Sequence, residues 1–323
     1  MPAPRILLVK LSSLGDVVHL LPGVTDLAAH RPGVHVAWAV ETPYAELAAL
    51  HPAVSRVIPV PLRRLRDRPW SRSAWLALRA AKAQLRAQRW DFVVDAQGLI
   101  KSGCVARWAR APVFGPDRAS ARERFAARFY DVKIAVPREM HAVERNRRLL
   151  AQVFGYEVTA PARYGLAPPA QPPAWAPAGR YAVLLHAASR ADKRWPDDRW
   201  VALGRRLGDD GYSMVLPGGN EAERADAARL AQAIGPMASA APAMPLAEAA
   251  ALLAHAAGVV GVDTGLSHLA VALGVPTVGI YCATSPRLTG LHGGALAVNL
   301  GGPRAAPDVD AVASAAGIGR GAA

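Results

Sequence analysis

The sequence predicts an α/β protein with two doubly wound domains, each built around a parallel sheet. Short β-branched or aliphatic runs alternate with Ala-, Leu- and Arg-rich stretches of helical period in both halves, a pattern typical of βαβ units. The chain has 323 residues, of which 52% are apolar and 20% charged, so it can bury two cores of ordinary size. The expected strands are Ile6–Lys10, Val34–Val40, Arg56–Val60 and Phe92–Asp95 in the first half, and Tyr181–His186, Ser213–Pro217, Gly258–Val262 and Thr277–Tyr281 in the second.

A proline-rich segment separates the two halves. Ala160–Gly179 contains six prolines among many alanines, a composition that suits neither a helix nor a central strand. We therefore expect a first domain over residues 1–160, a linker over 161–179 and a second domain over 180–300. Residues 301–323 are expected to form a Gly/Ala-rich tail with one weak helical segment near Val309–Ala315.

The sequence shows neither a membrane-spanning nor a secretory segment. Its most apolar stretch, Leu246–Val262, is interrupted by Glu248 and His255, and falls short of the roughly 18 apolar residues that a spanning helix needs. Two cysteines, Cys104 and Cys282, are too few for a disulfide framework and are interpreted as packing residues. We expect a cytoplasmic protein.

The positive charge of the chain lies entirely in its first half. Residues 1–163 hold 26 Lys and Arg against 13 Asp and Glu, whereas residues 164–323 hold 12 of each. This asymmetry indicates an anionic partner for the first half: a nucleic acid, an anionic membrane surface, or a phosphorylated and carboxylated substrate. The alternative is that the chain is simply rich in arginine and that these charges have no partner. Composition alone does not distinguish this alternative from an anionic partner.

The first candidate site follows the first expected strand. Ligands of doubly wound sheets bind outside the carboxyl ends of the strands, and Ser12–Asp16 forms a short Gly-containing turn there. Asp16 could act as a general base for a substrate hydroxyl in a cleft between the domains. It could also simply cap the next helix, because Ser13 and Asp16 have the spacing of a capping box. After the fourth expected strand, Asp95 could order its loop, while Gln97 and Lys101 could contact a ligand.

The second half contains a candidate anion site. Asp263–His268 follows the strand Gly258–Val262 and opens an apolar helix, so backbone N–H groups near Gly265 would face a phosphate at a helix N-terminus. His268 could add a donor to a diphosphate; a helix cap with a partly buried histidine is the alternative. The chain lacks both a convincing G-x-G-x-x-G after its first strand and a G-x-x-x-x-G-K-[ST] motif, which disfavours the usual dinucleotide and P-loop sites.

Two further loops of the second half carry charged residues. In His186–Pro196, Lys193 could neutralise a leaving diphosphate, or the loop could be solvated surface. Glu221 could accept hydrogen bonds from ribose hydroxyls, or could serve as the acidic first turn of the following helix.

Taken together, five segments resemble the lipopolysaccharide heptosyltransferase I family, in the same order along the chain. They are Val9–His19, Asp95–Ser102, His141–Arg145, Asp192–Pro196 and Asp263–His268. The resemblance implies a GT-B architecture, in which two Rossmann-like domains face each other and bind the acceptor and the donor respectively. It also implies ADP-L-glycero-D-manno-heptose as donor, Kdo2-lipid A as anionic glycolipid acceptor, inversion at the anomeric carbon, and peripheral association with the cytoplasmic face of the inner membrane.

The resemblance also assigns roles to individual residues. Asp16 matches the catalytic base. The donor contacts that it implies are Ser189, Lys193, Glu221, Asp263, Thr264, Gly265 and His268. The acceptor contacts are Ser12, Ser13, Gly15, Arg63, Arg64, Arg66, Gln97, Lys101, Arg122 and Arg145. One position departs from the family, because Ala188 stands where a threonine is common, so a hydroxyl remains only at Ser189.

The mechanism that this reading implies requires neither a metal nor another cofactor. Asp308 and Asp310 form a D-x-D pattern, but they fall in the expected tail, away from any strand end. The nearest alternative function is a sister heptosyltransferase that acts on a later core acceptor. A nucleic-acid-binding protein would explain the basic first half, but the aromatic content of 6% disfavours it. A nicotinamide-dependent oxidoreductase is disfavoured by the missing fingerprint.

Overall fold

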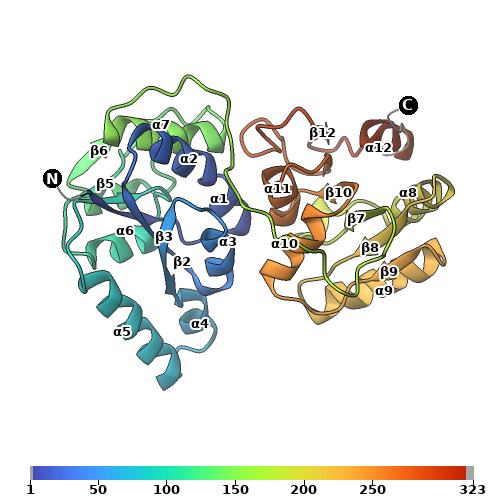
Figure 1. Ribbon diagram of the computed structural model, residues 1–323, viewed down its shortest axis with the longest axis horizontal. Coiled ribbons are helices and arrows are strands. Elements are labelled where there is room, and N and C mark those ends of the chain that lie inside the picture. The colour runs from blue at the N-terminus through green and yellow to red at the C-terminus, as the bar shows by residue number, and fades with distance from the viewer. Residues whose placement is uncertain (1–2, 318–323) are drawn as a thin grey trace. The chain divides into compact units, whose positions relative to one another are not determined.

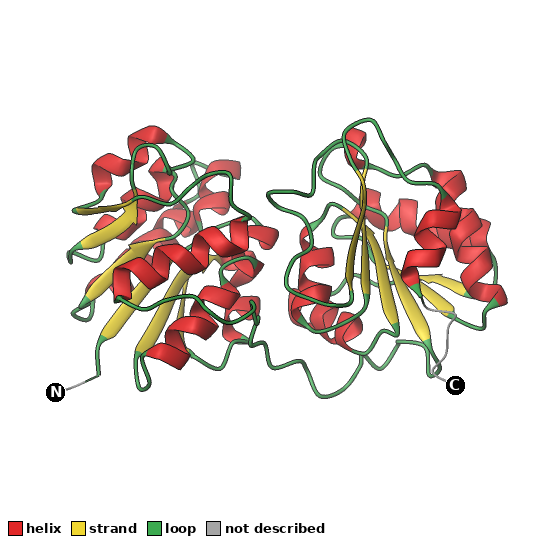
Figure 2. Cartoon of the chain, turned by 90° about the horizontal axis from the view of Figure 1, so that it is seen from above, coloured by secondary structure: helices red, strands yellow, loops and turns green. Residues whose placement is uncertain are grey.

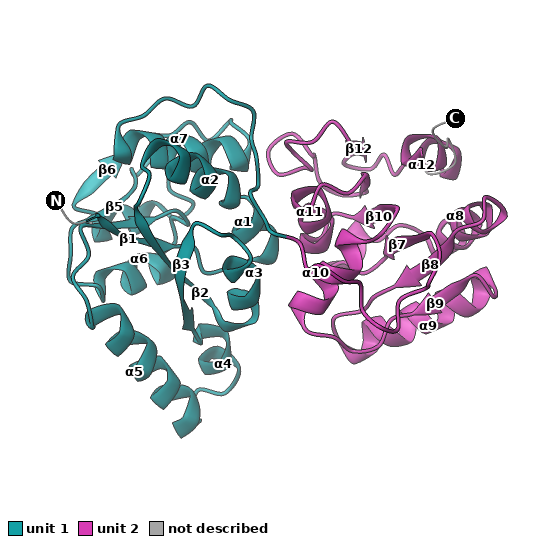
Figure 3. Cartoon of the chain, viewed as in Figure 1, with its two compact units in different colours: residues 1–167 teal, residues 168–323 magenta. Residues whose placement is uncertain are grey.

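The computed structural model describes residues 3–317 and divides the chain into two compact units, residues 1–167 and 168–323 (Figure 3). The division falls inside the proline-rich segment, and residues 161–179 contain no helix or strand. Each unit is a six-stranded, fully parallel sheet with helices on both faces (Figures 1 and 2). The α/β fold predicted from the periodicity is confirmed.

The first unit has the strand order β3-β2-β1-β4-β5-β6. Its strands are β1 Arg5–Val9, β2 His35–Glu41, β3 Val54–Val60, β4 Phe92–Asp95, β5 Val113–Pro116 and β6 Val132–Ile134. Its helices are α1 Leu14–Val18, α2 Leu21–His30, α3 Ala45–Ala49, α4 Leu62–Asp67, α5 Arg72–Arg86, α6 Ile100–Arg107 and α7 Ala142–Phe154, with 3-10 turns η1 Thr42–Tyr44 and η2 Arg124–Phe129.

The second unit repeats this topology, with the order β12-β11-β10-β7-β8-β9. Its strands are β7 Tyr181–Leu185, β8 Ser213–Leu216, β9 Ala238–Ala240, β10 Gly258–Val262, β11 Thr277–Tyr281 and β12 Ala297–Gly301. Its helices are α8 Asp197–Asp209, α9 Glu221–Ile234, α10 Leu246–Ala254, α11 Gly265–Ala272 and α12 Val309–Ala316, with the 3-10 turn η3 Ala191–Lys193.

Burial on both faces of the sheet explains why the central strands form where the sequence predicts them. In β1, Leu7 and Val9 join the core on one face of the sheet, and Ile6 and Leu8 are equally buried on the other. A strand covered on both faces needs such a continuous apolar run, which is the signal in the sequence. The strands that the sequence did not predict, β5, β6, β9 and β12, have three to five residues, and three of them lie at sheet edges.

The C-terminal segment belongs to the second core rather than to a separate tail. Val312 of α12 is fully buried in the same cluster as Trp200, and α12 packs against α8. Trp195 Nε1 donates a hydrogen bond to the carbonyl of Pro307 at 2.9 Å, which anchors the segment further. Composition concealed this role because a Gly/Ala-rich helix needs only a few buried methyl groups to pack. Residues 318–323 of the expected tail lie outside the described part.

No helix within the described range is both long and apolar enough to cross a bilayer.

Candidate functional site

Asp16 lies at the carboxyl end of β1, in the first turn of α1. Its Oδ2 accepts a hydrogen bond from the backbone N–H of Ser13 at 3.0 Å, so the capping contact that the spacing suggested is present. The same carboxylate also accepts two hydrogen bonds from Arg122 Nη1, at 3.2 Å to Oδ1 and 3.0 Å to Oδ2. The Asp16 side chain remains 22% exposed. Capping therefore leaves a charged, reachable carboxylate at the strand end.

Two cations keep Asp16 ionised. Burial opposes ionisation, but Lys10, Arg122 and the N–H of Ser13 outweigh it and hold the pKa of Asp16 below its usual value. Lys10 is itself buried, and its Nζ donates to the carbonyl of Ala96 at 2.8 Å. Burial lowers the pKa of Lys10 to about 8, opposed mainly by Asp16. At neutral pH the site holds a deprotonated carboxylate, the form that a general base requires.

The loop after β4 fixes the position of the Asp16 loop. Gln97 accepts the N–H of Leu11 at 2.6 Å and donates Nε2 to the carbonyl of Ser12 at 2.7 Å. Both ends of the Gln97 amide are thus used inside the unit, so its evident role is to hold this loop. A direct contact between Gln97 and an acceptor stays a prediction. Asp95, fully buried, accepts hydrogen bonds from the Ser102 and Tyr130 hydroxyls, both at 2.7 Å.

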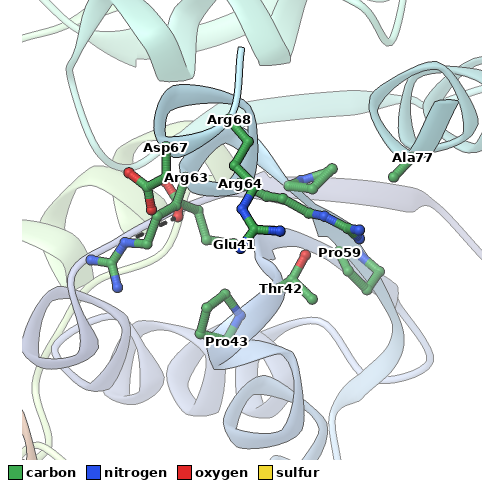
Figure 4. Close-up of a pocket in the computed structure, with 10 residues that line it drawn as sticks. Glu41, Thr42, Pro43, Pro59, Arg63, Arg64, Asp67, Arg68 and Ala77 are labelled. Carbon is green, nitrogen blue, oxygen red and sulfur yellow. Dashed lines mark ion pairs between the residues drawn. The ribbon is translucent and has the colours of Figure 1, made fainter. Parts of the chain in front are cut away.

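A pocket of about 520 Å³ opens at the carboxyl ends of β2 and β3, beneath α4 (Figure 4). Glu41, the last residue of β2, lies at this pocket with its side chain only 5% exposed. It faces Arg63 Nε at 4.0 Å and Lys101 Nζ at 3.5 Å, while its Oε2 accepts no hydrogen bond from any described residue. Lys101 also donates to the hydroxyl of Ser12 at 3.0 Å, which connects the pocket to the Asp16 loop.

The structure separates the predicted basic residues into two groups. Arg63 and Arg64 line the pocket beneath α4, together with Arg68, which the sequence analysis did not select. Arg66 does not line it; its Nε donates to Asp67 at 3.0 Å. Arg122 and Arg145 line a smaller cavity beside Gln97 and Ser120 instead.

The position of Arg145 sets its electrostatics. Burial and the nearby cations Arg122 and Arg138 lower the pKa of Arg145. Arg122 and Arg145 thus line a different cavity of the first unit from the one that Arg63 and Arg64 line.

In the second unit, Lys193 and Asp263 form the centre of the candidate site. Lys193 Nζ donates to Asp263 Oδ2 at 2.7 Å, and the hydroxyl of Thr284 donates to the same oxygen at 2.8 Å. The Lys193 and Asp263 side chains are 18% and 14% exposed. Trp195 and Trp200 are buried and meet edge to face at 5.0 Å, so the Lys193 loop is anchored rather than merely solvated.

The N-terminus of α11 lies directly beside this pair. Thr264 is the N-cap residue, Gly265 begins the helix, and neither is fully buried. The Ser267 hydroxyl donates to the carbonyl of Val262 at 2.9 Å, which closes the turn. His268 is the fourth helical residue and is buried. Backbone N–H groups at a helix start, together with a lysine, are able to bind a diphosphate.

The loop after β8 presents Glu221 as the first residue of α9, where it is exposed. Asn220 caps this helix by accepting the N–H of Glu223 at 2.9 Å, so Glu221 is not the capping group. Gly218 lies so close to α9 that an added Cβ would lie 2.5 Å from the Arg224 nitrogen, which explains the glycine. Ser189 is exposed in the preceding strand-end loop.

The D-x-D pattern has a structural explanation. Asp308 caps α12 by accepting the N–H of Ala311 at 2.8 Å, and Asp310 pairs with Arg206 at 2.7 Å. Within residues 3–317, no group of three His, Cys, Asp or Glu side chains could hold a metal ion.

A known protein family and several solved structures match this chain over most of its length. The sequence profile of glycosyltransferase family 9 (heptosyltransferase) matches residues 78–317. The chain is 44% identical to lipopolysaccharide heptosyltransferase 1 of Pseudomonas aeruginosa over 296 residues, which cover 90% of this chain and 81% of that one. It resembles the solved structure of Escherichia coli heptosyltransferase WaaC with ADP at a TM-score of 0.88 and 38% identity, covering 96% and 98% of the two chains. The same enzyme with ADP-2-deoxy-2-fluoro heptose gives a TM-score of 0.82 at 38% identity, covering 93% and 94%.

Two Rossmann-like units with polar loops at their strand ends define the chain as a glycosyltransferase of the GT-B class. Within that class, the chain belongs to glycosyltransferase family 9, the heptosyltransferases.

Four residues of the two candidate sites were not among those predicted from the sequence. Lys10, Glu41 and Arg68 join the first unit's site, and Thr284 joins the second. Lys10 directly follows β1 and Glu41 is the last residue of β2, so a rule that searches every strand end for charge would have found them. Thr284 follows β11, the neighbour of β10, and the same rule applies.

Proposed function

We propose that this protein transfers L-glycero-D-manno-heptose from ADP-heptose to a Kdo sugar of Kdo2-lipid A, with inversion at the anomeric carbon. The observation that carries the proposal is the ionised Asp16 at the β1 strand end, combined with the Lys193 and α11 anion site of the second unit. The relatives named lipopolysaccharide heptosyltransferase 1, and the related enzyme solved with an ADP-heptose analogue, support the donor and the reaction.

In the proposed mechanism, Asp16 takes the proton of the acceptor hydroxyl while its oxygen forms a bond to the anomeric carbon. The bond from that carbon to the ADP oxygen breaks on the opposite face. Lys193, His268 and the α11 amides stabilise the charge that develops on the departing diphosphate, and Glu221 holds the adenosine ribose. In this proposal the donor is also contacted by Ser189, Asp263, Thr264 and Gly265. No metal or other cofactor takes part.

The acceptor is an anionic glycolipid, so we propose that the protein works on the cytoplasmic face of the inner membrane, as a peripheral protein. Arg63 and Arg64 line a pocket at the strand ends that also contains a buried carboxylate, Glu41. This combination can bind the acid groups and the hydroxyls of one sugar together.

Mass spectrometry after incubation with ADP-heptose and Kdo2-lipid A tests the proposal, with the addition of one heptose as the expected product. An acceptor that already carries one heptose distinguishes a sister enzyme of later core assembly. No turnover of ADP-heptose with either acceptor would refute the proposed function.

The acceptor side has its own test. Changing Arg63 and Arg64 together to Ala should raise the KM for Kdo2-lipid A about tenfold, the effect of losing one or two charge-assisted hydrogen bonds, and leave the donor KM unchanged. Arg66→Ala is the matched control, because Arg66 lies on the same helix but does not itself line the pocket, although its partner Asp67 does. An equal rise in the KM of donor and acceptor would reject the acceptor role.

A further inference from the structure

The segment that joins α4 to α5 exposes an unusual amount of apolar surface. Trp70 is 94% exposed, Leu76 63% and Trp75 48%, and these three lie within seven residues. Only five other large apolar side chains in residues 3–317 are exposed, and they are spread over the rest of both units. An exposed cluster of this kind usually marks a contact surface.

The exposed side chains form a regular stripe on α5. Arg72, Trp75, Leu76 and Arg79 are all exposed, and their spacing of three, four and seven residues places them on one helix face. The face that packs onto the unit is made instead by Ala74, Ala81 and Leu85, which are buried. The helix therefore has a second, outward stripe in which two apolar side chains lie between two cationic ones.

The charge around this stripe is almost entirely positive. Residues 62–86 contain eight Lys or Arg and a single acidic residue, Asp67. Asp67 pairs with Arg66, and no carboxylate of the described residues pairs with Arg68, Arg72 or Arg79. Like charges gathered without counter-charges repel one another, and an anionic partner relieves that repulsion.

We propose that Trp70 and the outward stripe of α5 form a docking surface for a lipid bilayer with anionic headgroups. Trp70 and Leu76 enter the boundary between headgroups and acyl chains, where indole and aliphatic side chains are stable. Arg72 and Arg79 extend their guanidinium groups to lipid phosphates while their stems lie along the apolar layer. An RNA partner fits less well, because Leu76 has no aromatic face on which a base can stack.

This inference rests on the proposed function, because a glycolipid acceptor held in the membrane is the reason for the protein to dock there. The pocket with Arg63 and Arg64 is formed partly by α4 and by Ala77 of α5. A bilayer on the outward stripe would lie against the same helix that contributes Ala77 to the pocket wall, so headgroups would be held near the pocket while their acyl chains stay in the membrane. Vesicle binding itself needs neither donor nor turnover, so it can be tested independently of catalysis.

The experiment is co-sedimentation of the full-length protein with vesicles of phosphatidylcholine, with and without phosphatidylglycerol. The double variant Trp70→Ser, Leu76→Ser should bind the phosphatidylglycerol vesicles at least about tenfold more weakly, because it removes most of the exposed apolar area. The double variant Arg72→Gln, Arg79→Gln should also bind the phosphatidylglycerol vesicles about tenfold more weakly, since each arginine near an anionic surface strengthens binding several-fold. Its binding to pure phosphatidylcholine should change little.

Two controls match these variants. Leu296→Ser and Phe125→Ser remove exposed apolar side chains, 55% and 60% exposed, from other parts of the chain and should leave vesicle binding unchanged. All the changed side chains are exposed, and circular dichroism checks that each variant folds. Equal loss in a control, wild-type binding by either double variant, or RNA binding that competes with vesicles would overturn the proposal.

Activity assays separate a role of Trp70 and Leu76 in membrane docking from a role in the active site. Transfer of heptose to a deacylated acceptor in solution should be unchanged in the Trp70→Ser, Leu76→Ser variant, and loss of that activity would place these residues in the active site instead. A wild-type protein that binds anionic vesicles but turns over no ADP-heptose would refute the proposed function and leave the docking surface standing.

Discussion

The two units share one topology but use the same position of it differently. Asp95 ends β4 in the first unit, and Asp263 follows β10, the equivalent strand of the second. Asp95 is fully buried and accepts four hydrogen bonds, from the hydroxyls of Ser102 and Tyr130 and from the N–H groups of Gln97 and Gly98. Asp263 is partly exposed.

The difference comes from the donors that each unit supplies. Asp263 receives side-chain hydrogen bonds from Lys193 and Thr284, both of which lie at strand ends themselves. Topology thus decides where a carboxylate stands, and its local donors decide whether it orders a loop or remains available to a ligand. The loops after β1 and β7 are also equivalent and also differ in charge. The first carries the acid Asp16, and the second carries the cation Lys193.

Replacing Asp16 by Asn should have the largest effect. We expect heptose transfer to slow by roughly 10²–10⁴-fold, the usual range for loss of a general base, with ADP affinity unchanged. Steady-state kinetics and calorimetry with ADP measure the two quantities. Ser13→Ala is the control, because it alters the cap and keeps the carboxylate. If Asp16→Asn turned over at a near-normal rate, Asp16 would be no more than a capping residue.

The contrast between Asp95 and Asp263 can be tested by exchanging each for Asn. Asp95→Asn should lower the free energy of unfolding by about 1–3 kcal/mol, since an amide NH2 group replaces one of the two oxygens that accept hydrogen bonds from buried donors. Asp263→Asn should cost less than about 1 kcal/mol but impair the use of ADP-heptose. Urea unfolding and donor kinetics on both variants separate the roles. If Asp263→Asn lowered the free energy of unfolding more than Asp95→Asn, the number of hydrogen bonds that each carboxylate accepts would not predict its role.

A buried histidine makes the stability of the first unit sensitive to pH. Burial lowers the pKa of His51 to about 4, and its ring accepts the N–H of Ala53 at Nδ1 and meets the Thr25 hydroxyl at Nε2. The unfolded chain, with a histidine pKa of about 6.5, binds the proton first. The stabilisation is therefore complete above pH 6.5 and is lost as the pH falls towards 4.

His51→Gln removes this titration. Between pH 7 and pH 5 the variant should lose about 2 kcal/mol less unfolding free energy than the wild type. Burial also lowers the pKa of His186 in the second unit, but this residue is common to both proteins, so the difference reports His51. Denaturant titrations at several pH values provide the measurement, and parallel stability curves would contradict the prediction.

Lys193→Ala should weaken ADP-heptose binding and slow transfer together, each about tenfold, because in the proposed mechanism the ammonium contacts the diphosphate before and after bond breakage. Arg190→Ala is the control, since Arg190 is exposed in the same loop and pairs with Asp192. Calorimetry and kinetics that match the wild type would reduce the Lys193–Asp263 pair to a structural contact.

The central strands and the strand-end loops could be predicted from the sequence because both signals are local. A strand buried on two faces needs an unbroken apolar run, and a helix that follows it needs a turn with glycine or a capping residue. The short strands β5, β6 and β9 give little signal, since three or four residues such as Ala238–Ala240 have no distinctive period. Their pairing is decided by neighbours already in place.

Local sequence thus determined the fold class, the division into two units, and the loops on which the charged residues lie. It also determined the family, because five short segments occur in one order. Only the tertiary structure decided which of those residues meet. Arg122 reaches Asp16 across 106 positions, and Lys193 reaches Asp263 across 70.

Tertiary packing also placed the Gln97 amide against the loop after β1, exchanged Arg66 for Arg68 in the pocket lining, and left Trp70 and Leu76 exposed. The physical reason is that a side chain's partners depend on which strand ends lie side by side and on which helix face the sheet covers. Neither property is a function of nearby residues alone.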